Sequence, residues 1–280
     1  MSKKTAVIET LFRARCISGS IPESDRVVTL EEVSEAIRKL NIVAREELLS
    51  PRNPANFMKD IVRNETRNQV FPGSVVISGW TARQLTGDGN CFEFVPLPDG
   101  QTTAFEVVAP PIGMVPHPIQ SLSLVPAARR YGRRDESWLT QVTTDLAVVQ
   151  THFALKSSLP LQGIAVVASN IKLGRGVADA LYYAEGKDRE RYLLACEMKH
   201  ASEVLDQDQV LRVATAVQQS RGKVDADAEV VPVAVKVAYP GSVGGHKGLI
   251  WIREYDACFP PLTLKSEGLY ELRPSVQGID

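Results

Sequence analysis

Two acidic residues and a lysine, separated along the chain, have the types and spacing needed for a charged site. Glu197 and Lys199 are two residues apart. They project from one face of a strand, because successive side chains alternate across it. A hairpin partner that carries Asp179 would bring a second carboxylate beside them. Charges at the end of an apolar sheet are usually paired or bind something, so these residues are the first candidates for chemistry.

The stretch 176–199 predicts the β-hairpin that positions these side chains. Residues 177–183 are rich in β-branched and aromatic types, which favour a strand. Residues 185–188 (EGKD) have the composition of a turn. Residues 192–196 form a second apolar run, which ends at Glu197. The aspartate and the glutamate–lysine pair therefore belong to neighbouring strands.

The surrounding pattern predicts the order helix, three strands, helix and two strands. A helix capped at Asp135 should run to about Leu155, with an apolar stripe along one side. The other predicted elements are a strand at 164–167, the hairpin, a helix at about 203–219, and strands at 230–239 and 249–252.

This order, with Asp179 and the tripeptide Glu197-Met198-Lys199, resembles the core of the PD-(D/E)xK (restriction-endonuclease-like) nuclease superfamily over roughly 135–256. Ala178 stands where the family usually has proline. The resemblance implies that Asp179 and Glu197 bind Mg²⁺ (or Mn²⁺), together with the backbone carbonyl of Met198. It also implies that Lys199 orients or activates a water.

Phosphodiester hydrolysis explains why these residue types occur together. Carboxylates are the oxygen ligands that Mg²⁺ prefers, and the metal activates water and neutralises charge on the phosphate. Many family members add an acidic residue from the preceding helix, for which Glu136 is the first candidate and Asp145 the second. The family usually leaves 5′-phosphate ends. One alternative is that the three central residues form a structural ion-pair cluster at a sheet edge. Another is that they are the remnant of a nuclease that is no longer active.

The first hundred residues predict a small helical domain with a two-stranded hairpin. Thr29 and Glu32 form a capping box that opens the second helix. A third helix should run from Ala55 to about Arg67, and strands are expected at 74–78 and 91–95. Over roughly residues 5–97 this layout resembles a winged helix-turn-helix domain, which places its third helix in the DNA major groove.

Candidate DNA contacts follow from that resemblance and from local basic patches. The groove-facing candidates are Arg52, Asn56, Lys59 and Arg63, with Arg83 on the wing; further candidates are Arg129, Arg130, Arg133 and Arg134, whose guanidinium groups match phosphate geometry, and Gln207 and Arg212 on the helix after the motif. The alternatives are that these side chains are solvated surface charges, or that the winged domain contacts protein.

Length and composition set the remaining bounds. The chain of 280 residues suits two domains, and we predict a winged-helix-like domain at 1–108, a proline-rich connector and basic segment at 109–134, and a nuclease domain at 135–280. The predicted class is α/β (α+β), with a mixed central sheet. The net charge of −1 gives no overall DNA-binding signature. No apolar run approaches the roughly 20 residues of a membrane helix. The first residues lead into an amphipathic segment and not into a signal peptide's apolar core, so we expect a cytoplasmic protein. Its four cysteines are scattered, which makes structural zinc and disulfides unlikely.

The sequence thus predicts a Mg²⁺-dependent endonuclease of the restriction or defence type, with double-stranded DNA as its partner and no membrane association. Cleavage of both strands favours a homodimer. The competing prediction is a non-enzymatic DNA-binding regulator whose nuclease-like domain serves for dimerisation. A third is a nuclease for single-stranded DNA or RNA.

Overall fold

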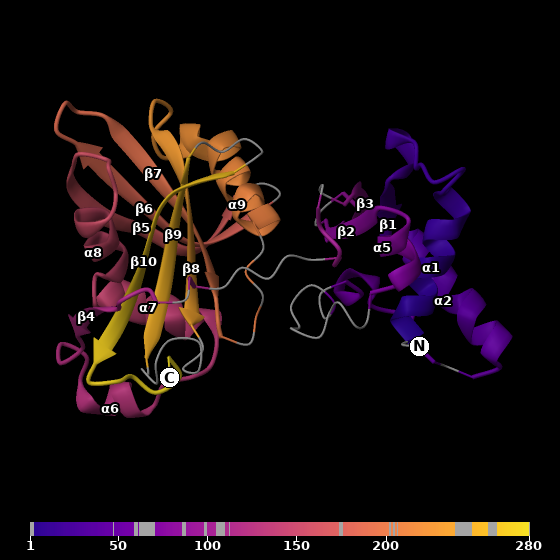
Figure 1. Cartoon of the computed structure of the whole chain (residues 1–280), viewed down its shortest axis with the longest axis horizontal. Helices are drawn as coiled ribbons and strands as arrows, with labels where there is room; N and C mark the ends of the chain where they lie inside the picture. Colours follow the sequence, from indigo (N-terminus) through magenta and orange to yellow (C-terminus); the bar gives the residue numbers. More distant parts are fainter. Residues whose placement is uncertain are drawn as a thin grey trace. The chain divides into compact units, whose positions relative to one another are not determined.

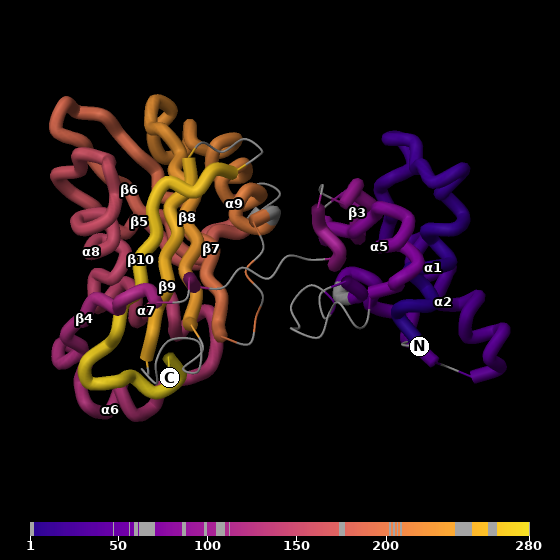
Figure 2. Tube along the Cα trace, viewed as in Figure 1, coloured from indigo at the N-terminus to yellow at the C-terminus, as the bar shows by residue number. Residues whose placement is uncertain are grey.

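The chain folds into two compact units, residues 1–107 and 108–280. The structure is a computed structural model, shown in Figure 1 and as a Cα trace in Figure 2. It describes residues 3–46, 48–58, 61, 71–85, 88–97, 100–104, 110–111, 113–173, 176–201, 203, 205, 207–238, 248–256 and 262–279. The predicted boundary after residue 108 differs from the observed one by a single residue. The predicted connector at 109–134 falls within the second unit.

The first unit combines helices with a three-stranded antiparallel sheet. Its elements are α1 (Lys3–Arg15), η1 (Glu23–Asp25), β1 (Val27–Thr29), α2 (Leu30–Ala44), η2 (Pro54–Asn56), α5 (Gly73–Ile77), β2 (Trp80–Gln84) and β3 (Asn90–Pro96). The strand order is β1-β3-β2. The capping box at the start of α2 is present: Thr29 accepts from the Glu32 backbone, and the Glu32 carboxylate accepts from the Thr29 backbone N–H at 2.8 Å.

One expectation for the first unit is wrong, and another falls mostly outside the described residues. The strand predicted at 74–78 is wrong, because the chain from Gly73 to Ile77 is the helix α5. This helix ends at Ile77; Gly79 follows with a φ of 78°, a conformation that glycine adopts without strain, and β2 begins at the next residue. Most of the third helix predicted at 55–67 lies outside the described residues.

The second unit is built on a seven-stranded mixed sheet. Its elements are β4 (His117–Gln120), α6 (Pro126–Arg130), α7 (Glu136–Asp145), α8 (Val148–Leu155), β5 (Leu161–Leu173), β6 (Gly176–Gly186), β7 (Arg191–Lys199), α9 (Gln207–Ser220), η3 (Arg221–Lys223), β8 (Glu229–Ala238), β9 (Leu249–Asp256) and β10 (Thr263–Arg273). The strand order is β4-β10-β9-β8-β7-β6-β5, in which β7 and β8 are parallel and β4 is parallel to β10. The protein is therefore of the mixed α+β class.

Helices cover both faces of this sheet (Figure 1). Side chains of α7 and α8 pack with Leu194 and Cys196 of β7, whereas Leu193 and Ala195 of the same strand pack with α9. The middle of β7 is consequently buried on both faces, which explains its continuous apolar run.

Three expectations for the second unit were incomplete. The single helix predicted at 135–155 is two helices, separated where Ala147 takes a left-handed φ of 50°. The strand predicted at 164–167 extends over all of β5. Strands β4 and β10 were not predicted; Pro118 is tolerated in β4 because that strand lies at an edge of the sheet.

Candidate active site

The register of the hairpin β6–β7 brings Asp179 to Glu197. Ala180 pairs with Cys196 in this antiparallel ladder, so the next step outward sets residue 179 opposite residue 197. Directly opposed residues share a face of the sheet. The backbone N–H of Met198 donates to Oδ2 of Asp179 at 2.7 Å, which fixes this carboxylate at the end of β7.

The ammonium of Lys199 lies between two glutamates. Its Nζ is 2.7 Å from Oε1 of Glu197 and 2.8 Å from Oε1 of Glu136, and it donates to the carbonyl oxygen of Met198 at 3.1 Å. The Lys199 side chain is only 4% exposed. A lysine this deeply buried requires close anions, because an unpaired buried charge is very costly.

Glu136 reaches this cluster from the first turn of α7. Asp135 caps that helix, since its Oδ1 accepts from the backbone N–H of Trp138 at 2.8 Å. The helix start therefore fixes where Glu136 projects, and the structure unites all four predicted residues: Asp179, Glu197, Lys199 and Glu136.

Negative charge exceeds positive charge among these four side chains. Burial, and then the neighbouring charge of Glu197, raise the pKa of Asp179 to about 7, against the opposing effects of Lys199 and the Met198 N–H. Burial alone would lower the pKa of Lys199, but Glu197, Glu136 and Asp179 together raise it above its ordinary value. Lys199 therefore stays protonated, whereas the carboxyl group of Asp179 gains or loses its proton near neutral pH.

A second buried lysine lies beside the site and was missed from the sequence. Lys236 on β8 pairs in register with Lys199, and its Nζ donates to the carbonyl of Glu203 at 2.5 Å. Lys236 is 6% exposed. The signal was a single charged residue in the otherwise apolar run 230–238, which a buried parallel strand does not ordinarily contain.

The predicted groove-contacting residues are only partly described. Arg52 is exposed in a turn before η2. The backbone of Asn56 belongs to η2, but its side chain lies outside the described part of the chain, as do Lys59 and Arg63. Arg83 on β2 contacts Glu93 on β3 through two guanidinium nitrogens at 2.7 and 2.8 Å. This ion pair braces the hairpin of the first unit.

The basic segment 129–134 leads directly into α7. Arg129 and Arg130 end α6, and Arg130, Arg133 and Arg134 are exposed. Nε of Arg133 is 3.1 Å from Oδ2 of Asp135, the cap of the helix that carries Glu136. Four arginines therefore lie within seven residues of a side chain in the site.

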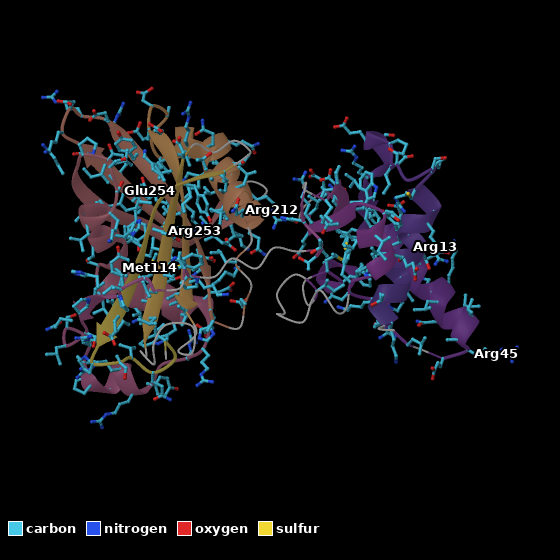
Figure 3. The ribbon with its side chains drawn as sticks, in the orientation of Figure 1. Arg13, Arg45, Met114, Arg212, Arg253 and Glu254 are labelled. Atoms are coloured by element: carbon cyan, nitrogen blue, oxygen red, sulfur yellow. The ribbon has the colours of Figure 1, made fainter. Side chains whose placement is uncertain are left out.

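The two candidates after the motif both belong to α9. Gln207 is the first residue of this helix, and Arg212 lies within it (Figure 3). Both side chains are half-buried.

The donor set fits a divalent ion that uses few protein ligands. Within the described residues, no group of three His, Cys, Asp or Glu side chains is arranged to hold a metal ion. Mg²⁺ is commonly bound through one or two carboxylates and keeps several waters. Asp179 and Glu197 are two hard carboxylates on adjoining strands, and burial, followed by the charge of Glu197, raises the pKa of Asp179. That combination suits Mg²⁺ and does not suit a cage made entirely of protein ligands.

The chain matches no protein-family model, no curated protein and no solved structure. Among the helices that the structure describes, none combines the length and apolarity required to cross a bilayer.

Proposed function

We propose that this protein is a Mg²⁺-dependent DNA endonuclease with Asp179, Glu197 and Lys199 at its active site. The observation that carries the proposal is the convergence of these three side chains at the ends of β6 and β7. The resemblance to PD-(D/E)xK nucleases predicts this arrangement from the sequence. The excess of negative charge at a partly closed site also supports it, because such a site favours a divalent cation.

Each side chain has a defined role in the proposed hydrolysis. Mg²⁺, held by Asp179, Glu197 and the Met198 carbonyl, would supply Lewis-acid stabilisation of the phosphate and a more acidic water. Lys199 orients the attacking water and stabilises negative charge on the phosphate. Glu136 positions the Lys199 ammonium through its 2.8 Å contact. The expected products carry 5′-phosphate ends.

The first unit is proposed to bind DNA as a winged-helix-like domain. The order α1, β1, α2, α5, β2 and β3, with the sheet order β1-β3-β2, supports this proposal. The Arg83–Glu93 pair would stiffen the wing. Arg129, Arg130, Arg133 and Arg134 are proposed to contact phosphates near the site, because they are joined to the helix that carries Glu136. A cytoplasmic location and a homodimer that cuts both strands belong to the same proposal.

Plasmid digestion tests the chemistry. With Mg²⁺ the protein should cleave supercoiled DNA, and EDTA, Asp179→Ala or Lys199→Ala should abolish cleavage. The matched control is Asp188→Ala, an exposed residue in the turn of the same hairpin, which should retain activity. Cleavage that survives Asp179→Ala would overturn the assignment. Single-stranded DNA and RNA substrates in the same assay distinguish the nucleic acid that is cut.

A second function is favoured by the direct contacts of Lys199. Ion pairs at 2.7 and 2.8 Å satisfy its charge with protein groups alone, as in a structural cluster. In that case the protein is a DNA-binding regulator whose second unit serves for dimerisation. Sequence-specific DNA binding without cleavage, unchanged by Asp179→Ala, would favour this function.

A further inference from the structure

The two edges of the seven-stranded sheet differ in how well they are protected. One edge is β4, which has four residues and includes Pro118. The other edge is β5, which has 13 residues and, among the described strands, pairs along one side only, with β6. Short strands and proline block edge-to-edge pairing, whereas a long edge strand presents unpaired N–H and C=O groups to another chain. Of these two strands, β4 is short and contains proline, whereas β5 is long and contains none; β5 carries two register shifts and Lys172 instead.

The side chains of β5 are unusual for an exposed edge. Val166 and Val167 are 38% and 42% exposed, and they lie near the middle of the strand. The strand contains no acidic residue and no proline, and its single charged residue is Lys172, near one end. Register shifts at 161–163 and 166–168 bend the strand locally, but it keeps its pairing with β6 over its whole length.

We propose that β5 is the dimer interface and that it pairs antiparallel with β5 of a second copy of this chain. Antiparallel pairing of identical strands generates a two-fold axis, so one surface complements itself. With the axis near Val166 and Val167, Lys172 lies opposite the uncharged start of the partner strand around Gln162, so no like charges oppose each other.

The geometry of this dimer suits the proposed function, and the inference deepens the homodimer part of that proposal. The two-fold axis of an antiparallel strand pair is perpendicular to the sheet, so equivalent faces of both copies point the same way. Strand β5 is the direct neighbour of β6, which carries Asp179. The two sites would then lie on one face of a continuous sheet, on either side of the interface.

Molar mass in solution is the first test. Light scattering coupled to gel filtration, at micromolar protein, should give twice the chain mass of 30.7 kDa. The double variant Val166→Lys/Val167→Lys should halve that mass, because four ammonium groups would meet at the axis. The control Leu264→Lys changes a side chain that is 38% exposed on β10, at the opposite side of the sheet from β5, and should remain dimeric. A monomeric wild type, or a dimeric double-lysine variant, overturns the inference.

Cysteine cross-linking tests the register and does not depend on a destabilising change. Val167→Cys lies at the axis and should form a disulfide-linked dimer under oxidation. Gln162→Cys is exposed on the same strand but far from the axis, and should not cross-link above the wild-type level. Equal cross-linking at both positions overturns antiparallel pairing. The two proposals fail separately: a monomer with Mg²⁺-dependent cleavage rejects only the interface, and a β5-linked dimer without cleavage rejects only the chemistry.

Discussion

In the second unit, the four-residue cluster and the contacts around His152 balance charge in different ways. The first is the four-residue cluster of Asp179, Glu197, Lys199 and Glu136. The second surrounds His152, whose Nδ1 is 2.9 Å from the Tyr270 hydroxyl and whose Nε2 is 3.0 Å from Ser266 Oγ. Ser266 donates to Oε2 of Glu254 at 2.6 Å, and Ser157 donates to Oε1 of the same carboxylate at 3.0 Å. Glu254, on β9, is labelled in Figure 3.

The hydrogen bonds of the His152 cluster agree with one neutral tautomer. Because Ser266 gives its proton to Glu254, it accepts from Nε2–H of His152, and Nδ1 then accepts from Tyr270. Every polar group in this chain of contacts has a partner, as a structural network requires. In the four-residue cluster three carboxylates face one ammonium, and the pKa of Asp179 is displaced to about 7. The contrast separates a network whose hydrogen bonds are complete from the cluster at which we propose that a cation binds.

Removal of Lys199 should have the largest effect. Lys199→Met leaves Glu197 and Glu136 without their buried partner and should reduce the free energy of unfolding by about 3–5 kcal/mol. Chemical denaturation at neutral pH measures it. Lys187→Met, an exposed lysine in the turn between β6 and β7, is the control and should change stability by less than about 0.5 kcal/mol. If Lys199→Met lowers the free energy of unfolding no more than the control does, the charge of Lys199 does not stabilise the cluster.

Acid should destabilise the protein through His152. Burial, with a smaller effect from Lys156, lowers the pKa of His152 to about 4. The unfolded chain binds this proton near pH 6.5 and the folded chain does not, so stability falls between pH 6.5 and 4, by about 3 kcal/mol for the full shift. Unfolding curves of wild type and His152→Gln across this range should diverge. Parallel curves would contradict a neutral buried histidine.

Asp179→Asn should stabilise the protein while abolishing cleavage. The raised pKa means that the folded state holds the proton longer than the unfolded state, so ionisation reduces stability as pH rises from about 4 to about 7. An amide keeps an acceptor for the Met198 N–H and removes that charge.

We expect a gain of the order of 1–3 kcal/mol at pH 8 that disappears at pH 4. Thermal or chemical unfolding at the two pH values measures this gain. Lower stability at pH 8 would instead favour the structural ion-pair cluster.

Glu136→Gln should have the smallest effect on stability. Lys199 keeps its ion pair with Glu197, and an amide oxygen replaces the carboxylate of Glu136. The free energy of unfolding should therefore change by about 1 kcal/mol or less. If Glu136 positions the ammonium, kcat should fall about tenfold while KM for DNA changes little. A change in KM alone would assign Glu136 to DNA binding.

Signals between neighbouring residues predicted several helices and the central hairpin, but they did not predict the helix break at Ala147 or the strands β4 and β10. The capping box, the hairpin and the helix of residues 207–220 depend on neighbouring residues, and the structure contains them. The helix break at Ala147 carries no glycine or proline, and β10 mixes charged and apolar residues without clean alternation, so neither could be predicted from pattern. The helix α5 was predicted as a strand because its residues Val75, Val76 and Ile77 are β-branched.

The sequence by itself determined that Glu197 and Lys199 share a face and that a hairpin sets Asp179 near them, because alternation and turn chemistry are local. Only the tertiary structure decided that Glu136 reaches Lys199, that Lys236 lies beside it, and that β5 is an edge. Those facts depend on which strands are neighbours and where a distant helix begins. Strand order depends on how all the strands and helices bury their apolar surfaces together, and no single segment of the sequence contains that information.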